Sequence, residues 1–377
     1  RSACAWRTDP DAVAPGIFGP RNLPRLLRSD FTENSNDSYW LANPRDPLEG
    51  FATIIGDERK PRSLRTRVGL TMLEEALGRL HNHPLTKFTR QQLQDLVFND
   101  RQYGGELARD DAVALCTAMG GTAPTTNAPG VVALGNACPV LAAWDLHENL
   151  DSKGAVLWRE FWGRAMAIAG TGPWVPNTFN PSDPVNTPNT LNPADPRVRT
   201  ALGDAVRALN DNSIPLDAVL RDYQYAQRGS ERIPIHGGKG DPNGDFNAIN
   251  RGVLTSKAAG YGDVRHGSSF VQVVSFNGTP CPDTRTILTY SQSTNPNSPY
   301  FADQTRMFSN KEWVTDLFCE QQIASDPNLT TRTLSDGSVL PATAPLRPLS
   351  VAWPSTIVAL LALGVIAMFA HRRARAS

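Results

Sequence analysis

The amino-acid sequence predicts an α+β fold, with helices in the first part of the chain and strands in the second. Apolar residues recur at helical spacing in several segments before residue 210. After His236 the pattern changes to short runs of Val, Ile and Thr, which are typical of strands. A chain of 377 residues with this ordinary globular composition can also bury a substantial core.

The helices are predicted from apolar spacing and from capping residues, and a loop-rich segment, Arg1 to Glu58, precedes them. Thr with Gln three residues later is a capping box, and Asp followed by Pro favours the start of a helix. The expected helices are Ser63 to Gly78, a helix opened by Thr89 and Gln92, Asp110 to Met119, Ser152 to Met166, and a helix opened by Asp195 and Pro196.

Two segments near the C-terminal end are predicted to form paired strands. Ser269 to Phe276 and Thr284 to Ser291 are rich in β-branched residues, and the dipeptide Asn277-Gly278 between them favours a turn. By contrast, Pro173 to Asp195 contains repeated Asn-Pro, Asp-Pro and Thr-Pro steps, which favour turns over helix or sheet. This segment is therefore expected to be a long loop.

Charge and cysteine content exclude several classes of protein. The chain has 37 basic and 37 acidic residues and no basic stripe, so a nucleic-acid partner is not expected. Its five cysteines form no C-x-x-C, which argues against redox and zinc motifs. Four cysteines allow three connectivities; Cys116 with Cys138 and Cys281 with Cys319 are the pairings nearest in sequence, and Cys4 is left over.

Both ends of the chain carry signals about its context. The residues from Arg1 onward lack an initiator Met and a signal peptide, so we expect the chain to begin within a longer protein. Val351 to Ala370 is an uncharged apolar run of membrane-spanning length, and the tail 371–377 is basic. We expect an exported body over 1–340, a tether over 341–350, and a transmembrane helix with a cytoplasmic tail.

A dense motif, RSDFTENSNDSYWLANPRDPLEG, begins at Arg28, and an Arg-containing helix, RSLRTRVGLTMLEE, begins at Arg62. Further motifs are IPIHGG, YGDVRHGSSFVQVVSF and YSQSTNPNSPYFADQ. Together these segments resemble the penicillin acylase family, most closely the branch of the aculeacin A acylases and the acyl-homoserine-lactone acylases. The similarity covers most of residues 20 to 325.

The resemblance implies the four-layer αββα fold of N-terminal-nucleophile hydrolases, of which this chain would be the C-terminal part of the β-chain. In that family an N-terminal Ser attacks the amide carbonyl, and its own α-amine is the base. The nucleophile, the second oxyanion donor and much of the acyl pocket would lie upstream, so the chain alone is expected to be inactive. The expected partners are the upstream α-chain and N-terminal β-chain portion of the same precursor, and an acyl-amide substrate.

The resemblance places the oxyanion-hole side chain on Asn36, the second Asn of NSND. Asn34 is the alternative if the register differs by two residues. A neutral amide suits this role, because its NH₂ group donates hydrogen bonds without titrating near neutral pH. The structural alternative is that either Asn only caps a turn.

The active-site Arg of the family falls on Arg67, in the Arg-containing helix. Because Arg67 lies near the edge of the apolar face, we expect its guanidinium to orient the N-terminal amine or Asn36. Arg65 is expected to point elsewhere on the helix. A structural or surface ion pair is the alternative for Arg67.

Neither a cofactor nor a metal is expected. Some penicillin acylases bind calcium partly through an Asp that follows the Asn, but the nearest candidate, Asp46, has a different spacing. His236 and His266 lie beside glycines, and structural hydrogen bonds are expected for both. The predicted function is removal of an acyl group from a lipopeptide, a homoserine lactone or a β-lactam. The alternative is a non-catalytic, membrane-tethered binding protein that keeps the acylase fold.

Overall fold

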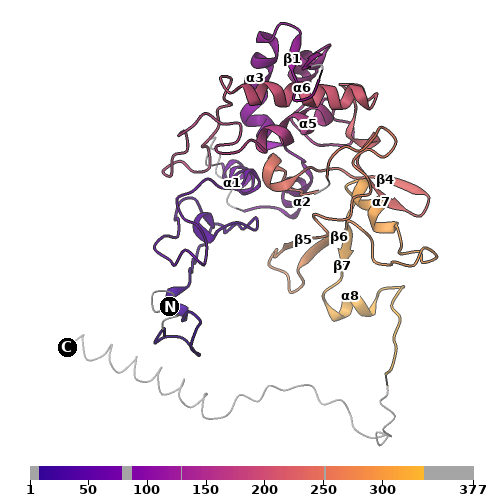
Figure 1. Ribbon diagram of the computed structural model, residues 1–377. Helices are drawn as coiled ribbons and strands as arrows, with labels where there is room; N and C mark the ends of the chain where they lie inside the picture. Colours follow the sequence, from indigo (N-terminus) through magenta and orange to yellow (C-terminus); the bar gives the residue numbers. More distant parts are fainter. Residues whose placement is uncertain (1–7, 79–86, 129, 250–251, 335–377) are drawn as a thin grey trace, which may run out of the picture. The chain divides into compact units, whose positions relative to one another are not determined.

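The computed structural model describes residues 8–78, 87–128, 130–249 and 252–334. Contacts divide the chain into two compact units, Arg1–Ile323 and Ala324–Ser377, and the elements labelled in Figure 1 belong almost entirely to the first. The expected transmembrane helix and basic tail lie outside the described residues. Among the helices that are described, none has the length and apolar character needed to cross a bilayer.

Helices dominate the described chain as far as residue 211, as the periodicity predicts (Figure 1). Ser63 caps the first helix, and Thr89 with Gln92 forms the predicted capping box of the second. The third helix begins at Tyr103, earlier than expected, because the side chain of Gln102 already caps it. The helices are α1 (Leu64–Ala76), α2 (Arg90–Phe98), α3 (Tyr103–Ala118), α4 (Ala137–Ala143), α5 (Ala155–Met166) and α6 (Pro196–Asp211).

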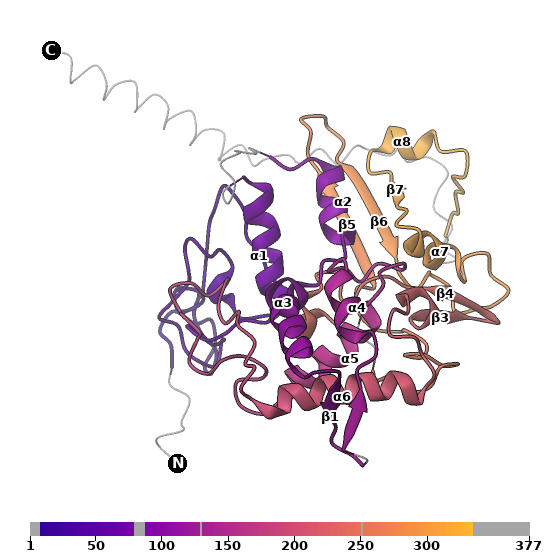
Figure 2. The ribbon, with the colours of Figure 1, turned by 90° about the horizontal axis from the view of Figure 1, so that it is seen from above.

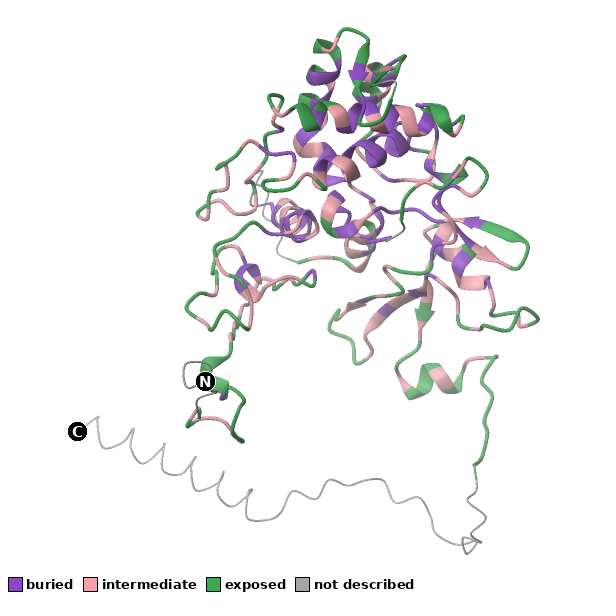
Figure 3. Ribbon diagram, in the orientation of Figure 1, coloured by how far each residue is buried: buried purple, intermediate pink, exposed green. Residues whose placement is uncertain are grey.

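The main core is built on α5 and α6, which lie side by side in both views (Figures 1 and 2). Trp158 of α5 stacks between Trp144 and Trp162, with ring centroids 5.2 and 5.1 Å away. All three rings are buried, and Figure 3 shows buried residues concentrated on these helices. Large aromatic rings bury more apolar area than other side chains, so this stack is a major part of the core.

The two predicted strands pair as expected. β5 (Phe270–Ser275) runs antiparallel to β6 (Asp283–Leu288), and β7 (Val314–Asp316) pairs with the other edge of β6. The dipeptide Asn277-Gly278 lies between β5 and β6, but the connection is longer than a two-residue turn. A short helix, α7 (Asp303–Ser309), precedes β7.

Two hairpins were not predicted, since segments of three or four residues carry little alternation. They are β1 (Thr122–Pro124) with β2 (Val131–Ala133), and β3 (Tyr225–Arg228) with β4 (Glu231–Pro234). The sheets of the described chain thus have two, two and three strands. These residues alone do not form the four layers of the αββα arrangement.

A second, smaller core surrounds His236 and joins distant parts of the sequence. His236 Nδ1 lies 2.9 Å from Asp100 Oδ1, and His236 Nε2 lies 2.9 Å from the Phe308 carbonyl oxygen. Lys311 Nζ lies 2.8 Å from the other carboxylate oxygen of Asp100. The structural role expected for His236 is confirmed, whereas His266 is exposed.

Both sequence-near cysteine pairings form disulfides. Cys116 bonds to Cys138, which joins α3 to α4 across the β1–β2 hairpin. Cys281 bonds to Cys319, which joins the β5–β6 connection to the residue before α8 (Glu320–Ala324). The structure therefore selects one of the three connectivities that the sequence left open.

Candidate active site

The NSND motif folds into a tight turn that presents Asn36 at the surface. Asn34 Oδ1 accepts a hydrogen bond from the Asn36 backbone N–H at 2.9 Å, and Asn34 Nδ2 donates to the Asp37 carbonyl at 3.3 Å. Asn36 has a φ of 58°, in the left-handed region that Asn tolerates better than most residues. Asn34 therefore has the turn-capping role, and Asn36 has the projecting amide.

Arg65 orients the Asn36 amide. Its Nη2 donates to Asn36 Oδ1 at 2.8 Å and to the Ser35 carbonyl at 2.6 Å. Its Nε donates to Asp241 Oδ1 at 2.9 Å, in the single π-helical turn Gly240–Gly244. Since the guanidinium takes the amide oxygen, the Asn36 NH₂ group faces away from Arg65 and keeps its donors for another acceptor.

The hydrogen bond to Asn36 comes from Arg65, and Arg67 bonds to other groups, so of its two expected partners only the N-terminal amine stays a prediction. Arg67 is 1% exposed; its Nε donates to the Val185 carbonyl at 2.6 Å and its Nη1 to the Pro188 carbonyl at 2.9 Å. Residues two apart on an α-helix differ by about 200° in direction, so Arg65 and Arg67 face nearly opposite sides of α1. Arg67 instead holds the proline-rich loop that was predicted from its composition.

Asp37 fixes the motif to the start of α1. Its carboxylate accepts hydrogen bonds from Arg62 Nη1 at 2.9 Å, the Ser63 N–H at 3.1 Å and Thr66 Oγ1 at 2.9 Å. Burial opposes the charged form, but hydrogen bonds from the Ser38 and Ser63 backbones and from Thr66 outweigh it, so the pKa of Asp37 lies below its ordinary value. The ionised Asp37 side chain therefore fixes the end of the NSND turn to the N-terminus of α1.

Glu33 is a partly buried carboxyl group beside the motif that sequence reasoning missed. Burial raises the pKa of Glu33 to about 7, although a hydrogen bond from Ser35 and the charge of Arg65 oppose the shift. Ser35 Oγ donates that hydrogen bond to Glu33 Oε1. Glu33 therefore changes charge near neutral pH, close to the guanidinium that holds Asn36. A Glu within a polar motif gives no sequence signal of burial.

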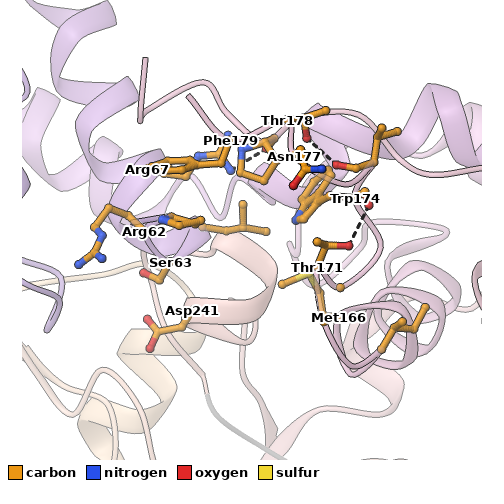
Figure 4. Close-up of a pocket in the computed structure, with 17 residues that line it drawn as sticks. Arg62, Ser63, Arg67, Met166, Thr171, Trp174, Asn177, Thr178, Phe179 and Asp241 are labelled. Carbon is orange, nitrogen blue, oxygen red and sulfur yellow. Dashed lines mark hydrogen bonds between the residues drawn. The ribbon is translucent and has the colours of Figure 1, made fainter. Parts of the chain in front are cut away.

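A cavity of about 520 Å³ lies beside α1 (Figure 4). Its lining includes Arg62 and Arg67, Trp174 and Phe179 of the proline-rich segment, and Asp241. Because Asp241 also pairs with Arg65, the cavity lies next to the groups that support Asn36. Its mixture of aromatic and polar groups is typical of sites for small organic molecules.

The described residues contain no cluster of three or more His, Cys, Asp or Glu side chains with metal-binding geometry. Asp46, the nearest match to the calcium-binding Asp of some relatives, lies 3.5 Å from Arg28 Nη1 and is mostly exposed.

The family model of penicillin amidase matches residues 1–325, and the chain therefore belongs to the penicillin amidase family. Aculeacin-A acylase from Actinoplanes utahensis is 46% identical over 332 residues, which is 87% of this chain and 40% of that protein. The acyl-homoserine lactone acylase PvdQ of Pseudomonas fluorescens is 34% identical over 339 residues, with 89% and 41% covered. The branch expected from the motifs is thus confirmed.

The chain spans about two-fifths of the length of these curated relatives. Among solved structures, the chain is similar to a thermostable penicillin G acylase from Alcaligenes faecalis, with a TM-score of 0.35 and 16% identity. That match covers 71% of this chain and 53% of the acylase.

Proposed function

We propose that this chain is part of an amide hydrolase that removes an acyl group from an amine-bearing core, such as a lipopeptide, an acyl-homoserine lactone or a β-lactam. Membership of the penicillin amidase family and similarity to aculeacin-A acylase support this function. The observation that carries the proposal is the hydrogen bond from Arg65 to Asn36 Oδ1, which leaves the amide NH₂ group as the outward donor.

In the proposed reaction, Asn36 donates to the oxyanion that forms when a nucleophile attacks the amide carbonyl. Such a donor acts only if it is held in place before the reaction, and Arg65 provides that orientation. The N-terminal Ser nucleophile, the second donor and the acyl pocket come from an upstream portion, which completes the four-layer fold. The cavity lined by Trp174 and Arg67 takes part of the amine-bearing core, and Arg67 acts by holding its wall.

The test is hydrolysis of fatty-acyl and phenylacetyl amides by this chain co-expressed with the upstream portion of an acylase of the same branch. Asn36→Ala should lower kcat by roughly 10²- to 10³-fold, the effect of losing one oxyanion donor. Asn34→Ala is the matched control, because Asn34 caps the same turn without presenting a free NH₂ group.

Undiminished turnover in Asn36→Ala, with a large loss in Asn34→Ala, would move the donor role to Asn34. A folded complex that hydrolyses none of the amides would instead support the non-catalytic binding protein. The two variants also need unfolding curves, so that a loss of turnover is separated from a loss of fold.

A further inference from the structure

Two buried carboxyl groups, Glu148 and Asp245, lie against the backbone of Gly238. Both residues are 0% exposed. A Cβ atom added to Gly238 would lie 2.5 Å from Glu148 Cδ and 2.6 Å from Asp245 Cγ, so these carboxyl carbons are no more than about 5 Å apart. We call these two residues the carboxyl pair. Two ionised carboxylates at this separation, away from water, would repel each other strongly.

The carboxyl pair has fewer donors than acceptors. Glu148 Oε1 accepts a hydrogen bond from Asn243 Nδ2 at 3.1 Å, and Arg159 Nη1 lies 3.9 Å from Glu148 Oε2. Within the described residues, Glu148 Oε2 and both carboxyl oxygens of Asp245 have no hydrogen-bond partner. A buried carboxylate without donors is costly, so one group of the pair needs a proton or another source of hydrogen bonds.

The surrounding charges do not neutralise two carboxylates. Arg159 is close to Glu148, and half-buried Lys239 contributes a weaker positive field. The negative charges of Asp100 and Glu106 also repel Asp245. Asp100 is paired with Lys311, and Glu106 is paired with Arg101. Burial, followed by repulsion from Glu148, raises the pKa of Asp245 well above its ordinary value, and burial raises that of Glu148 to about 7.

We propose that Glu148 and Asp245 share one proton, so that Asp245 donates to Glu148 Oε2 and the pair carries a single negative charge that Arg159 balances. The proton is taken from solvent as the chain folds, and it returns to solvent when the pair ionises. This arrangement supplies the missing donor for Glu148 Oε2 and removes the repulsion between the two groups.

The carboxyl pair is connected to the candidate active site through the turn Gly240–Gly244. Asn243 of this turn donates to Glu148, and Asp241 of the same turn accepts from Arg65. Asp245 follows the turn directly. The shared proton therefore holds the turn that positions Arg65, and this second part of the inference rests on the proposed function.

The test compares the pH dependence of thermal unfolding of the wild-type chain and Asp245→Asn. The Asn amide donates to Glu148 without a proton that titrates. A carboxyl whose folded pKa is raised loses its stabilising contribution as pH rises through that pKa. Between pH 5 and pH 9 the unfolding midpoint of the wild type should therefore fall by roughly 5 °C more than that of Asp245→Asn.

Glu160→Gln is the matched control, because Glu160 is also buried but pairs with Arg164, at 2.6 Å. This variant should keep the wild-type pH slope. Glu148→Gln, the reciprocal change in the pair, removes the repulsion but leaves Asp245 buried. It should therefore reduce the slope by less than Asp245→Asn does, and it serves if the Asp245 variant does not fold.

Parallel pH profiles for the wild type, Asp245→Asn and Glu148→Gln would overturn the shared proton. So would stabilisation of the wild type by millimolar CaCl₂ that EDTA reverses and Asp245→Asn abolishes, since a cation would then lie between the carboxylates. Unfolding of the chain requires no catalysis, so a failure of the amide hydrolysis experiment leaves this test unaffected.

Discussion

The guanidinium of Arg65 and the carboxylate of Asp241 lie 2.9 Å apart, although 176 residues separate them in sequence. The same guanidinium holds the Asn36 amide oxygen. Asn36 projects from a loop that has no regular secondary structure, so its orientation depends on this long-range ion pair. The geometry of the candidate site is therefore set by the packing of the turn Gly240–Gly244 against α1.

The two arginines of α1 should have separable effects. Arg67→Met should lower the free energy of unfolding by about 2–4 kcal/mol, because the buried Arg67 guanidinium no longer bonds the Val185 and Pro188 carbonyls. Arg65→Met should cost no more than about 1 kcal/mol, since its partner Asp241 is half-exposed. It should instead lower kcat of the assembled hydrolase about tenfold. Urea unfolding measures the stability of each variant, and steady-state kinetics measure its kcat. Equal losses of stability in the two variants would contradict the separate roles of Arg65 and Arg67.

Glu33 should make the chain less stable above neutral pH. Its pKa is raised from 4.5 to about 7 in the folded chain, first by burial. Its contribution is thus present below about pH 4.5 and is lost as pH rises through about 7, to a total of up to about 3 kcal/mol. Denaturant unfolding of Glu33→Gln should show a shallower pH dependence than the wild type. Exposed Glu312→Gln should follow the wild type, and a steep profile in Glu33→Gln would assign the effect to another group.

Two helical glycines should respond in opposite ways to Ala. A Cβ at Gly203 of α6 would lie 1.9 Å from the Pro124 carbonyl oxygen of β1, whereas a Cβ at Gly163 of α5 meets nothing within 4 Å. Gly203→Ala should destabilise the chain by about 3 kcal/mol or more, because α6 and β1 must separate. Gly163→Ala should stabilise it by roughly 0.5–1 kcal/mol through helix propensity. Thermal unfolding measures both changes in stability. An unchanged unfolding midpoint in Gly203→Ala would mean that the β1–β2 hairpin can move away from α6 at little cost.

The disulfide between Cys116 and Cys138 should stabilise the main core. It closes a loop of 22 residues around the β1–β2 hairpin, and Cys116 is fully buried. The double variant Cys116→Ala/Cys138→Ala should lose about 3 kcal/mol of unfolding free energy, and the hairpin should become sensitive to limited proteolysis. An unchanged unfolding midpoint would show that packing alone holds α3 and α4 together.

Elements with a strong local signal could be predicted from the sequence. The capping box of Thr89 and Gln92, and the Asp195-Pro196 start of α6, depend only on residues within one helical turn. The β3–β4 hairpin was missed because its strands are held by tertiary contacts, such as the parallel bridge between Tyr225 and Asp263. Short strands of this kind have no local pattern to detect.

The candidate site also depends on contacts between residues far apart in sequence, which local patterns do not predict. The NSND motif singled out the loop that presents Asn36, but which arginine of α1 meets this loop depends on the side of α1 against which the loop packs. Periodicity gives the apolar face of a helix, and it does not say which polar residue meets a distant loop. The carboxyl pair of Glu148 and Asp245 was not detectable either, since the two residues are far apart in sequence and the fold brings both of them against Gly238.

The network around His236 has a consequence for the order of folding. Asp100 and His236 are 136 residues apart, and His236 meets the Phe308 carbonyl another 72 residues later. Contacts of such long range form slowly, because a large loop must close before they stabilise anything. During synthesis Phe98, at the end of α2, and Asp100, just after it, are made long before their partners. These two residues stay without their final neighbours until the ribosome has added Lys311, so the second core can form only after nearly all of the first unit has been translated.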